Sequence, residues 1–414
     1  MADAAADAAR EVWITGVGVV STLGEGVQAH WQGLNAPPRA ADPATWAPFI
    51  IHPLAALDLD KQIPKKGDQR QMEAWQRIGT YAAGLALDSA GAKGNAELLA
   101  RMDMIVAAGG GERDAAVDTT ILSGLRTSER PEAFLNERLM NDLRPTLFLA
   151  QLSNLLAGNI SIVHGVTGSS RTFMGQESAG VDAVRIAHAR LQAGQSEIAL
   201  VGGAYNADQI AALLHFAMGR CLWKGELRPV WDRAGAGGMA LGSLGAFLVL
   251  EESRHAAARG AKPLARLSTV VSSHVKRRAG AVTAALAQMW STIAPRRAAH
   301  GLAVISGATG VEPATSEERA FLSAQGGIAM RATGSHLGHA LEAQFPMNIA
   351  LAAIALEQGR LFHSFDRSGL EHAMDEPLRQ VAVTSIGHWR GEGLALLEAL
   401  DERMIHDVPS RSRR

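Results

Sequence analysis

The sequence predicts an α/β protein built from two similar halves in tandem. Short β-branched runs alternate with longer stretches rich in Ala and Leu at helical spacing, which is the pattern of layered sheets and helices. Of the 414 residues 47% are apolar but only 5% are aromatic, so we expect a large core made mostly of Ala, Leu, Val and Gly. The order of elements restarts near residue 264, which predicts a pseudo-two-fold core even though no residue-level repeat is visible.

The first half takes its elements from residues 12–250. The β-branched run at 12–20 predicts the first strand, and Gly91 and Gly194 stand where glycine commonly ends a helix. A sharp strand-to-helix junction is expected at 172–180. Strands are predicted at 12–20, 104–108, 160–163, 198–203 and 246–250, and helices at 77–90, 147–158 and 181–192.

The second half is expected to repeat this order after a charged connector at 254–262. Strands are predicted at 264–272, 302–306, 381–383 and 394–397, and helices at 282–293, 317–323 and 348–358. The predicted division is therefore a disordered N-terminus at 1–10, halves at 11–253 and 254–408, and a basic tail at 409–414.

Composition excludes several classes of protein. The net charge of -1 argues against a chain built mainly for nucleic acid or a membrane surface. Cys221 is the single cysteine, so the chain has neither an internal disulfide nor a cysteine-rich metal site. The first ten residues lack the order of a signal peptide, and no apolar run is long enough to span a membrane. We expect a cytoplasmic protein without a metal or cofactor.

Four groups of residues together resemble the β-ketoacyl-acyl-carrier-protein synthases of the thiolase superfamily. They are 14–24; 191–194 with 201–204; 228–229 with 242–252; and 255–261. The resemblance extends over about residues 12–400, and it implies the thiolase fold, in which two α/β halves form a layered αβαβα core. Family members also pair about a two-fold axis, which implies a homodimer or heterodimer.

Three further stretches, at 67–72, 109–114 and 168–174, resemble one branch of that family. This branch contains the second of the paired synthases with which certain Gram-negative bacteria elongate the very-long-chain hydroxy fatty acid of lipid A. In that system the acyl chain is carried on a dedicated acyl carrier protein. The resemblance therefore implies an acyl carrier protein as a partner.

The residues at the family's catalytic positions differ from the family pattern. The family uses a cysteine thiolate at the N-terminus of a buried helix, where amide donors and the helix dipole lower the thiol pKa, and two histidines that stabilise the thioester oxygen. Aligning back from 191–194 places Glu177 at the cysteine position; Gly307 stands at the first histidine position and His339 at the second, and Gly334 replaces the family's lysine. A carboxylate is a poor acyl acceptor because an acyl anhydride is far more labile than a thioester.

Two neighbouring positions complete this alignment. Glu318 falls where the family has a downstream glutamate, and the loop that usually reads Gly-Phe-Gly-Gly contains His388 and Trp389 after Gly387. With the nucleophile, one histidine and the lysine absent, condensation by this chain alone is not expected.

Each unusual residue has more than one interpretation. Glu177 is either an anion that fills a lost cysteine position, with His339 as its partner, or a base that assists decarboxylation. His336 and His339 are three residues apart, but no third ligand stands on their face, so a metal site is not expected. Cys221 lies outside the nucleophile turn and is expected to be inert.

Two functional hypotheses follow. In the first, the chain is a non-catalytic, chain-length-factor-like partner of a cysteine-bearing synthase, and Thr146, Leu147 and Phe148 line the partner's acyl tunnel. In the second, it is a self-sufficient enzyme of this acyltransferase family with unusual chemistry, such as malonyl-carrier decarboxylation. The basic clusters at 65–66, 276–278 and 411–414 are solvated surface or docking sites for an acidic carrier. The absence of Cys at 177 and His at 307 favours the first hypothesis.

Overall fold

Most of the strands form one large sheet with an internal repeat, and the short β3 (Ile51–His52) and β7 (Leu241–Gly242) form a separate pair. The computed structural model describes residues 10–39, 41–143, 148–149, 151–233, 235, 237–298 and 300–400. Within these residues an 11-stranded sheet has the order β11-β10-β12-β13-β9-β1-β8-β6-β4-β5, with β2 beside β1. The first-half strands are β1 (Val12–Ser21), β2 (Gly24–Glu25), β4 (Asp103–Ala107), β5 (Ser170–Phe173), β6 (Ile198–Tyr205) and β8 (Leu244–Glu252). The second-half strands are β9 (Ala265–Ser273), β10 (Leu302–Ser306), β11 (Ala329–Ala332), β12 (Gln380–Ile386) and β13 (Glu392–Glu398).

The two halves of the sheet have the same topology. Without the short β2, each half contributes five strands to the large sheet. Numbered along the chain within each half, these strands follow the order third, second, fourth, fifth and first from the outer edge to the middle of the sheet. In each half the second strand is parallel to both neighbours, and the remaining pairs are antiparallel. The first strands, β1 and β9, join the halves in antiparallel pairing. The predicted pseudo-two-fold core is confirmed.

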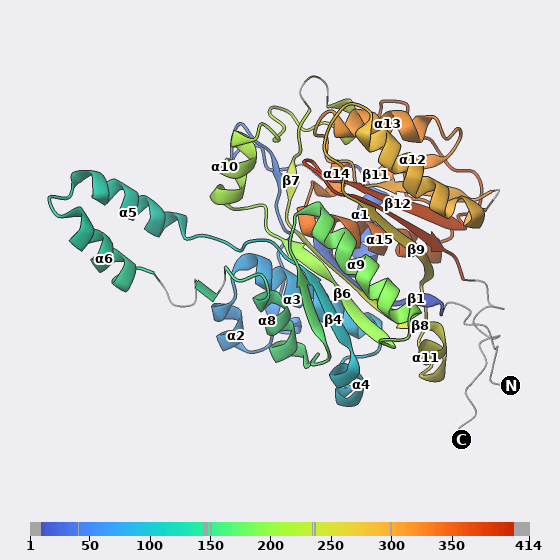
Figure 1. Ribbon diagram of the computed structural model, residues 1–414, viewed down its shortest axis with the longest axis horizontal. Helices are drawn as coiled ribbons and strands as arrows, with labels where there is room; N and C mark the ends of the chain where they lie inside the picture. The colour runs from blue at the N-terminus through green and yellow to red at the C-terminus, as the bar shows by residue number, and fades with distance from the viewer. Residues whose placement is uncertain are drawn as a thin grey trace.

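Helices cover both faces of this sheet and lie between its halves (Figure 1). The central pair, α9 (Glu177–Gln192) and α15 (Gln344–Glu357), pack against each other and against strands of both halves. The outer face of the first half is covered by α3 (Ala74–Ser89) and α8 (Leu155–His164), and that of the second half by α12 (Ala281–Ile293) and α13 (Ala314–Ser323). These layers match the expected αβαβα arrangement. The shorter helices include α1 (Gly26–Leu34), α2 (Lys66–Gln71), α4 (Ala96–Arg101), α11 (Ser253–Ala258), α14 (Gly334–Leu337) and the 3-10 turn η4 (Leu341–Ala343).

Close backbone approaches explain why some strands and helices are rich in small residues. A Cβ at Gly18 of β1 would overlap the carbonyl oxygen of Ala82 in α3, and a Cβ at Gly180 of α9 would overlap that of Glu342. Residues 344–356 of α15 are all buried, so this helix is apolar on nearly every face. The Ala- and Gly-rich composition therefore allows the layers to lie close together.

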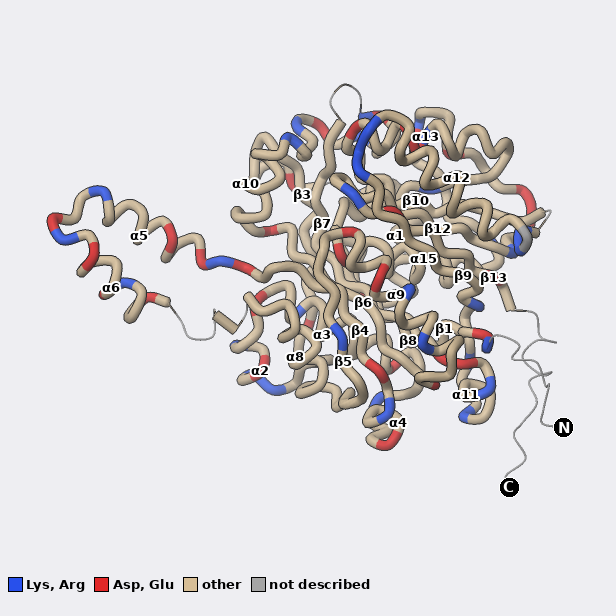
Figure 2. Tube along the Cα trace, viewed as in Figure 1, with Lys and Arg blue, Asp and Glu red and all other residues tan. Residues whose placement is uncertain are grey.

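An arm of two helices projects from the body (Figures 1 and 2). It consists of α5 (Ala115–Thr127) and α6 (Pro131–Asn141), which pack against each other. Gly124 lies directly against the Phe134 ring, where no side chain would fit, and Ile121 is buried. The arm has little core of its own, because no residue of α6 is buried.

One predicted strand is wrong, and several helices were not predicted. Three of the four residues at 160–163 are β-branched, but all four belong to α8. Leu156, Ile160 and His164 repeat at helical spacing and are buried, whereas Ile162 is exposed. The strand that precedes the nucleophile turn is β5. The arm helices and α10 (Ile210–Met218) were not predicted.

No helix in the described part of the chain combines the length and apolar character needed to cross a bilayer. Acidic and basic residues are interspersed over the chain (Figure 2).

Candidate functional site

Glu177 is the first residue of α9, directly after the turn that follows β5. Gln176, which precedes the helix, has φ 57° and ψ -134°, a conformation that non-glycine residues rarely adopt. This turn directs Glu177 into the protein, where its side chain is 1% exposed. The helix N-terminus provides a partial positive charge at this point, which suits a carboxylate.

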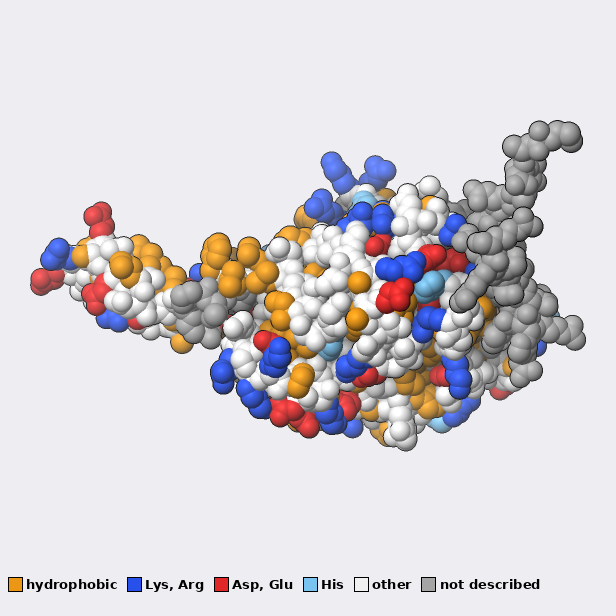
Figure 3. Space-filling model, turned by 90° about the horizontal axis from the view of Figure 1, so that it is seen from below, with side chains coloured by type: hydrophobic (Ala, Val, Ile, Leu, Met, Phe, Trp, Pro, Cys, Tyr) orange, Lys and Arg blue, Asp and Glu red, His pale blue; other side chains and the backbone are white. Residues whose placement is uncertain are grey.

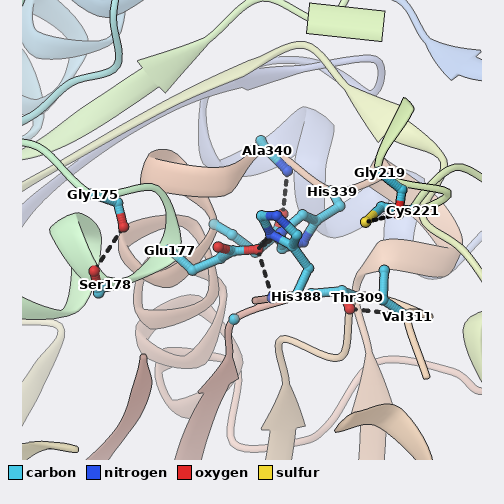
Figure 4. A network of polar contacts seen from close by, with 12 residues as sticks. Gly175, Glu177, Ser178, Gly219, Cys221, Thr309, Val311, His339, Ala340 and His388 are labelled. Carbon is cyan, nitrogen blue, oxygen red and sulfur yellow. Dashed lines mark hydrogen bonds and ion pairs between the residues drawn. The ribbon is translucent and has the colours of Figure 1, made fainter. Parts of the chain in front are cut away.

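Three hydrogen bonds meet on one oxygen of Glu177 (Figure 4). Oε1 lies 2.9 Å from Nε2 of His339 and 2.8 Å from Nδ1 of His388, and it accepts from the backbone N–H of His388 at 3.1 Å. The other oxygen, Oε2, has no hydrogen-bond partner among the described residues. The expected pairing of Glu177 with His339 is present, and His388 joins it.

This environment favours the ionised carboxylate. Burial by itself raises the pKa of Glu177, but the hydrogen bonds and the charges of His339 and His388 oppose it and hold the pKa well below its usual range. Glu177 is therefore an anion at neutral pH, and its free oxygen is enclosed.

His388 is the functional residue that the sequence reasoning did not select. It lies on the loop between β12 and β13, where Gly387 N donates to Gly391 O at 2.8 Å and Arg277 donates to Gly387 O. Its ring packs edge-on against Phe216, with centroids 5.3 Å apart. A signal was present in the sequence, since this histidine occupies the phenylalanine position of the family's Gly-Phe-Gly-Gly loop.

Gly307 leaves no room for the histidine that the family has there. It follows β10, and its N–H donates to Thr384 O at 3.0 Å. A Cβ at Gly307 would lie 2.7 Å from that same carbonyl oxygen and 3.2 Å from Nδ2 of Asn348. A side chain at this position therefore requires the neighbouring strand to shift.

Glu318, at the position of the family's downstream glutamate in the sequence alignment, has no cation beside it among the described residues. Glu318 is fully buried and takes part in no ion pair among the described residues; its Oε1 accepts from Ser306 Oγ at 2.9 Å and from Thr384 Oγ1 at 2.5 Å. Burial raises the pKa of Glu318 to about 7, although both hydroxyl donors lower it. A Cβ at Gly334 would lie 3.1 Å from Val230 Cγ2 and 3.3 Å from Ala308 O, so a longer side chain at this position would be crowded.

A pocket of about 380 Å³ lies beside the nucleophile turn. Its wall includes Gln176 and Glu342 but not Glu177, His339 or His388. The remaining lining comes from the end of β6, from α10, and from Trp75, 109–111, Arg113, Gln151, Asn206, Gln209 and Leu341. The cluster of Glu177, His339 and His388 therefore does not line this pocket.

The residues predicted to line an acyl tunnel are only partly described. Thr146 and Leu147 lie outside the described residues. Phe148 is 70% exposed and, with Ile121 and Leu139 of the arm, borders a second cavity of about 260 Å³. Its position at the base of the arm is compatible with contact to another chain.

The other candidates do not form a reactive centre. The ring of His336 packs edge-on against Phe365, and burial lowers the pKa of His336 to about 4. Cys221 Sγ donates to Gly219 O at 3.3 Å, and burial raises the pKa of this thiol, which disfavours a thiolate. Among the described residues, no three His, Cys, Asp or Glu side chains are placed to hold a metal ion.

Comparison with known proteins identifies the same family over most of the chain. The family model "Beta-ketoacyl synthase, N-terminal domain" matches residues 9–256. The chain is 26% identical over 264 residues to 3-oxoacyl-[acyl-carrier-protein] synthase 2 of Vibrio cholerae, covering 61% of this chain and 60% of that protein. It is 26% identical over 268 residues to Nodulation protein E of Rhizobium leguminosarum bv. trifolii, covering 63% of each. The matches thus span about three-fifths of these relatives' length.

Solved structures with the same fold cover nearly the whole chain. The ishigamide ketosynthase/chain length factor has a TM-score of 0.76 at 21% identity, covering 95% of this chain and 100% of that one. A beta-ketoacyl synthase from Burkholderia phymatum has a TM-score of 0.74 at 18% identity, with the same coverage. A chain of AntDE:AntF, a complex of an acyl-carrier protein with its ketosynthase, has a TM-score of 0.69 at 18% identity, covering 94% of this chain and 100% of that one.

Proposed function

Because this chain belongs to the beta-ketoacyl synthase family, we propose that it is a member without a nucleophilic cysteine, which acts as the partner subunit of a cysteine-bearing synthase. Its role resembles that of a chain-length factor in the synthesis of long or very long acyl chains, such as those of lipid A. The single observation that carries this proposal is Glu177 at the nucleophile position, with one of its oxygens bound by two imidazoles.

The geometry around Glu177 argues against condensation by this chain alone. Condensation needs an acyl acceptor and free donors for the thioester oxygen. Here the acceptor is a buried carboxylate, and its two histidine partners already donate to it. No donor replaces the missing histidine at Gly307 without movement of the strand that carries Thr384.

The edge of the sheet supports pairing with a second chain of this fold. Strand β5 ends the sheet in the described part of the chain, so one of its backbone edges has no strand beside it there. Apolar side chains gather near the base of the arm (Figure 3). Large exposed apolar residues near this edge and on the arm are Leu122, Leu139, Met140, Phe148, Leu149, Leu152, Ile162 and Met174. An edge strand and apolar surface of this kind are typical of an obligate interface.

A carrier protein is the expected source of the acyl chain. The AntDE:AntF structure, which shares this fold, contains an acyl-carrier protein with its ketosynthase. The basic residues at 65–66 and 276–278 supply positive charge that suits an acidic carrier. The three stretches that resemble the lipid A branch give the finer assignment.

The proposal is tested by co-expression with a neighbouring cysteine-bearing synthase. We expect the two chains to co-purify, the pair to elongate acyl-carrier substrates, and this chain alone to show no product. Replacing Phe148 by Trp should shorten the products of the pair, because each excluded methylene changes binding by about 0.8 kcal/mol. Failure to form a pair contradicts the proposal, and decarboxylation of malonyl-carrier by this chain alone supports the enzymatic alternative instead.

A further inference from the structure

Strand β5 has one backbone edge that no strand of the described residues occupies. On its other side it pairs with β4 in parallel. The carbonyl oxygens of Ser169 and Phe173 accept from backbone N–H groups in and directly after β4, at 2.8 and 3.0 Å. Because backbone groups point alternately to the two sides of a strand, the N–H and C=O groups of Ser170 and Thr172 face the free edge. A strand of a second chain can therefore bond to these two residues.

Arg171 is the only charged residue of β5, and its charge is not neutralised within the described part of the chain. Its Nη1 donates to Ser169 Oγ at 2.9 Å, and it takes part in no ion pair among the described residues. Arg190 of α9, by contrast, pairs with Asp103 at 2.9 Å. Side chains alternate along a strand, so Arg171 shares a face of the sheet with Phe173, which packs against the core on the side of α9.

Two copies of β5 at one interface would bring their Arg171 side chains together. Identical chains pair about a two-fold axis, and a sheet that continues through this axis is antiparallel, with each residue opposite one on the same face. When at least three residues of β5 pair with β5, Arg171 therefore lies opposite Arg171 or Phe173 of the second copy. In the first register the two Arg171 Cα atoms are about 4.5 Å apart, and in the second the arginines are diagonal neighbours at roughly 7–8 Å. Like charges at such positions destabilise the pair.

We propose that Arg171 makes β5 select an unlike partner, a chain of this fold whose edge strand presents the carboxylate of an Asp or Glu to Arg171. This inference rests on the proposed function, because it concerns the interface with the partner subunit. A carboxylate at this place replaces repulsion by attraction. Specificity of this kind depends on destabilising the wrong pair as well as on stabilising the right one. The second copy of this chain is the disfavoured occupant of the edge.

The test uses the full chain and two variants, and its main part needs no synthase. Arg171→Glu reverses the charge, and Arg171→Gln removes the charge while keeping an N–H donor for Ser169. Tagged and untagged chains are co-expressed and captured by the tag, and association constants are measured by sedimentation equilibrium. We expect the mixed pair of natural and Arg171→Glu chains to be about tenfold tighter than either chain with itself. Arg171→Gln should self-associate about threefold more tightly than the natural chain.

Two controls separate the effect of charge from damage to the strand. A glutamate that only disrupted β5 would weaken the mixed pair, whereas the proposal requires a stronger one. Arg254 is exposed on α11, which packs against β1 and β8 in the middle of the sheet, so Arg254→Glu is a matched charge reversal away from this edge. It should mix with the natural chain at random. The preference for the mixed pair should fall to about twofold in about 1 M salt, where the screening length is about 3 Å.

The cysteine-bearing synthase provides the second part of the test. Its affinity should fall about tenfold with Arg171→Glu and about threefold with Arg171→Gln.

The inference is overturned by a mixed pair that is absent or no tighter than the pairs of like chains. Self-association of the natural chain as tight as that of Arg171→Gln also overturns it. So does a synthase that binds the natural chain and Arg171→Glu equally, a result that leaves the proposed function standing. If no synthase pairs with the natural chain, the proposed function fails, and the mixed pair still decides the role of Arg171.

Discussion

Two buried glutamates in this molecule have pKa values that are shifted in opposite directions. Glu177, at the start of α9, and Glu318, in α13, are each no more than 1% exposed. The pKa of Glu177 is held well below its usual range by His339 and His388, although burial opposes this, whereas burial raises the pKa of Glu318 to about 7. The donors differ: Glu177 has two imidazoles and a helix N-terminus, and Glu318 has two hydroxyls.

The comparison shows that burial alone does not set the charge of a carboxyl group. The pKa of each carboxyl also depends on the hydrogen-bond donors and charged groups beside it. At Glu177 the acid is accompanied by His388 on the opposing loop. At Glu318 there is no cation among the described residues, and burial raises the pKa to about 7.

The prediction with the largest expected effect concerns whether a cysteine at position 177 restores condensation. We predict that neither the natural chain nor Glu177→Cys forms a ketoacyl product, because the donor lost at Gly307 is still missing. Intact-protein mass spectrometry after incubation with acyl- and malonyl-carrier measures acylation, and Cys221→Ala serves as the control for labelling of the natural cysteine. Product formation by Glu177→Cys alone would show that the missing donor is dispensable.

Removing the ionised carboxylate should destabilise the fold strongly. Glu177→Ala leaves two buried imidazoles without their acceptor, so we expect a loss of about 4 kcal/mol in the free energy of unfolding near neutral pH. Because the folded pKa of Glu177 is depressed, its contribution is present above the unfolded value of 4.5 and is lost as the pH falls below it. Urea unfolding of both proteins across pH measures this difference. A loss below about 1 kcal/mol would mean that the cluster contributes little.

Removing the ionisable carboxyl of Glu318 should stabilise the protein, which is the opposite of the effect expected at Glu177. The folded pKa of Glu318 is raised from 4.5 to about 7, so its stability contribution is present below 4.5 and is lost as the pH rises through 7. Glu318→Gln avoids this loss and should stabilise the protein by up to about 3 kcal/mol near pH 8, with little effect near pH 4. The adjacent Glu317 is a matched control: it accepts from three backbone N–H groups before and within α12, so Glu317→Gln should be destabilising. A pH-independent effect of Glu318→Gln would contradict this account.

The prediction with the smallest expected effect separates the two hydrogen-bond donors of His388, its ring nitrogen Nδ1 and its backbone N–H. His388→Phe restores the family residue and removes the ring donor, while the backbone N–H at this position still reaches Glu177. We expect a loss of about 1–2 kcal/mol and a rise in the pKa of Glu177, measured by unfolding and by NMR titration of the carboxyl group. His215→Phe changes a neighbouring ring that makes no bond to Glu177 and should be nearly neutral. Equal effects of the two variants would show that the ring of His388 makes no specific contribution to Glu177.

The sequence predicted the repeated α/β order and the pairing of Glu177 with His339, since both depend on local pattern and on family motifs. The strand expected at 160–163 was wrong because burial at helical spacing outweighed β-branched propensity. His388 was not selected because its contact depends on the loop after β12 returning to the start of α9, more than two hundred residues earlier. The helices of the arm were not predicted; in α6 the apolar periodicity is weak and no residue is buried.

The edge strand β5 and the arm also bear on how the cell maintains this chain. An uncovered strand edge and exposed apolar side chains are the features by which chaperones and proteases recognise incomplete proteins. If the chain pairs as proposed, we expect copies made in excess of the partner to be substrates for quality control, so that the abundance of this chain follows that of the partner. Subunit stoichiometry would then be set after translation, by removal of the unpaired copies.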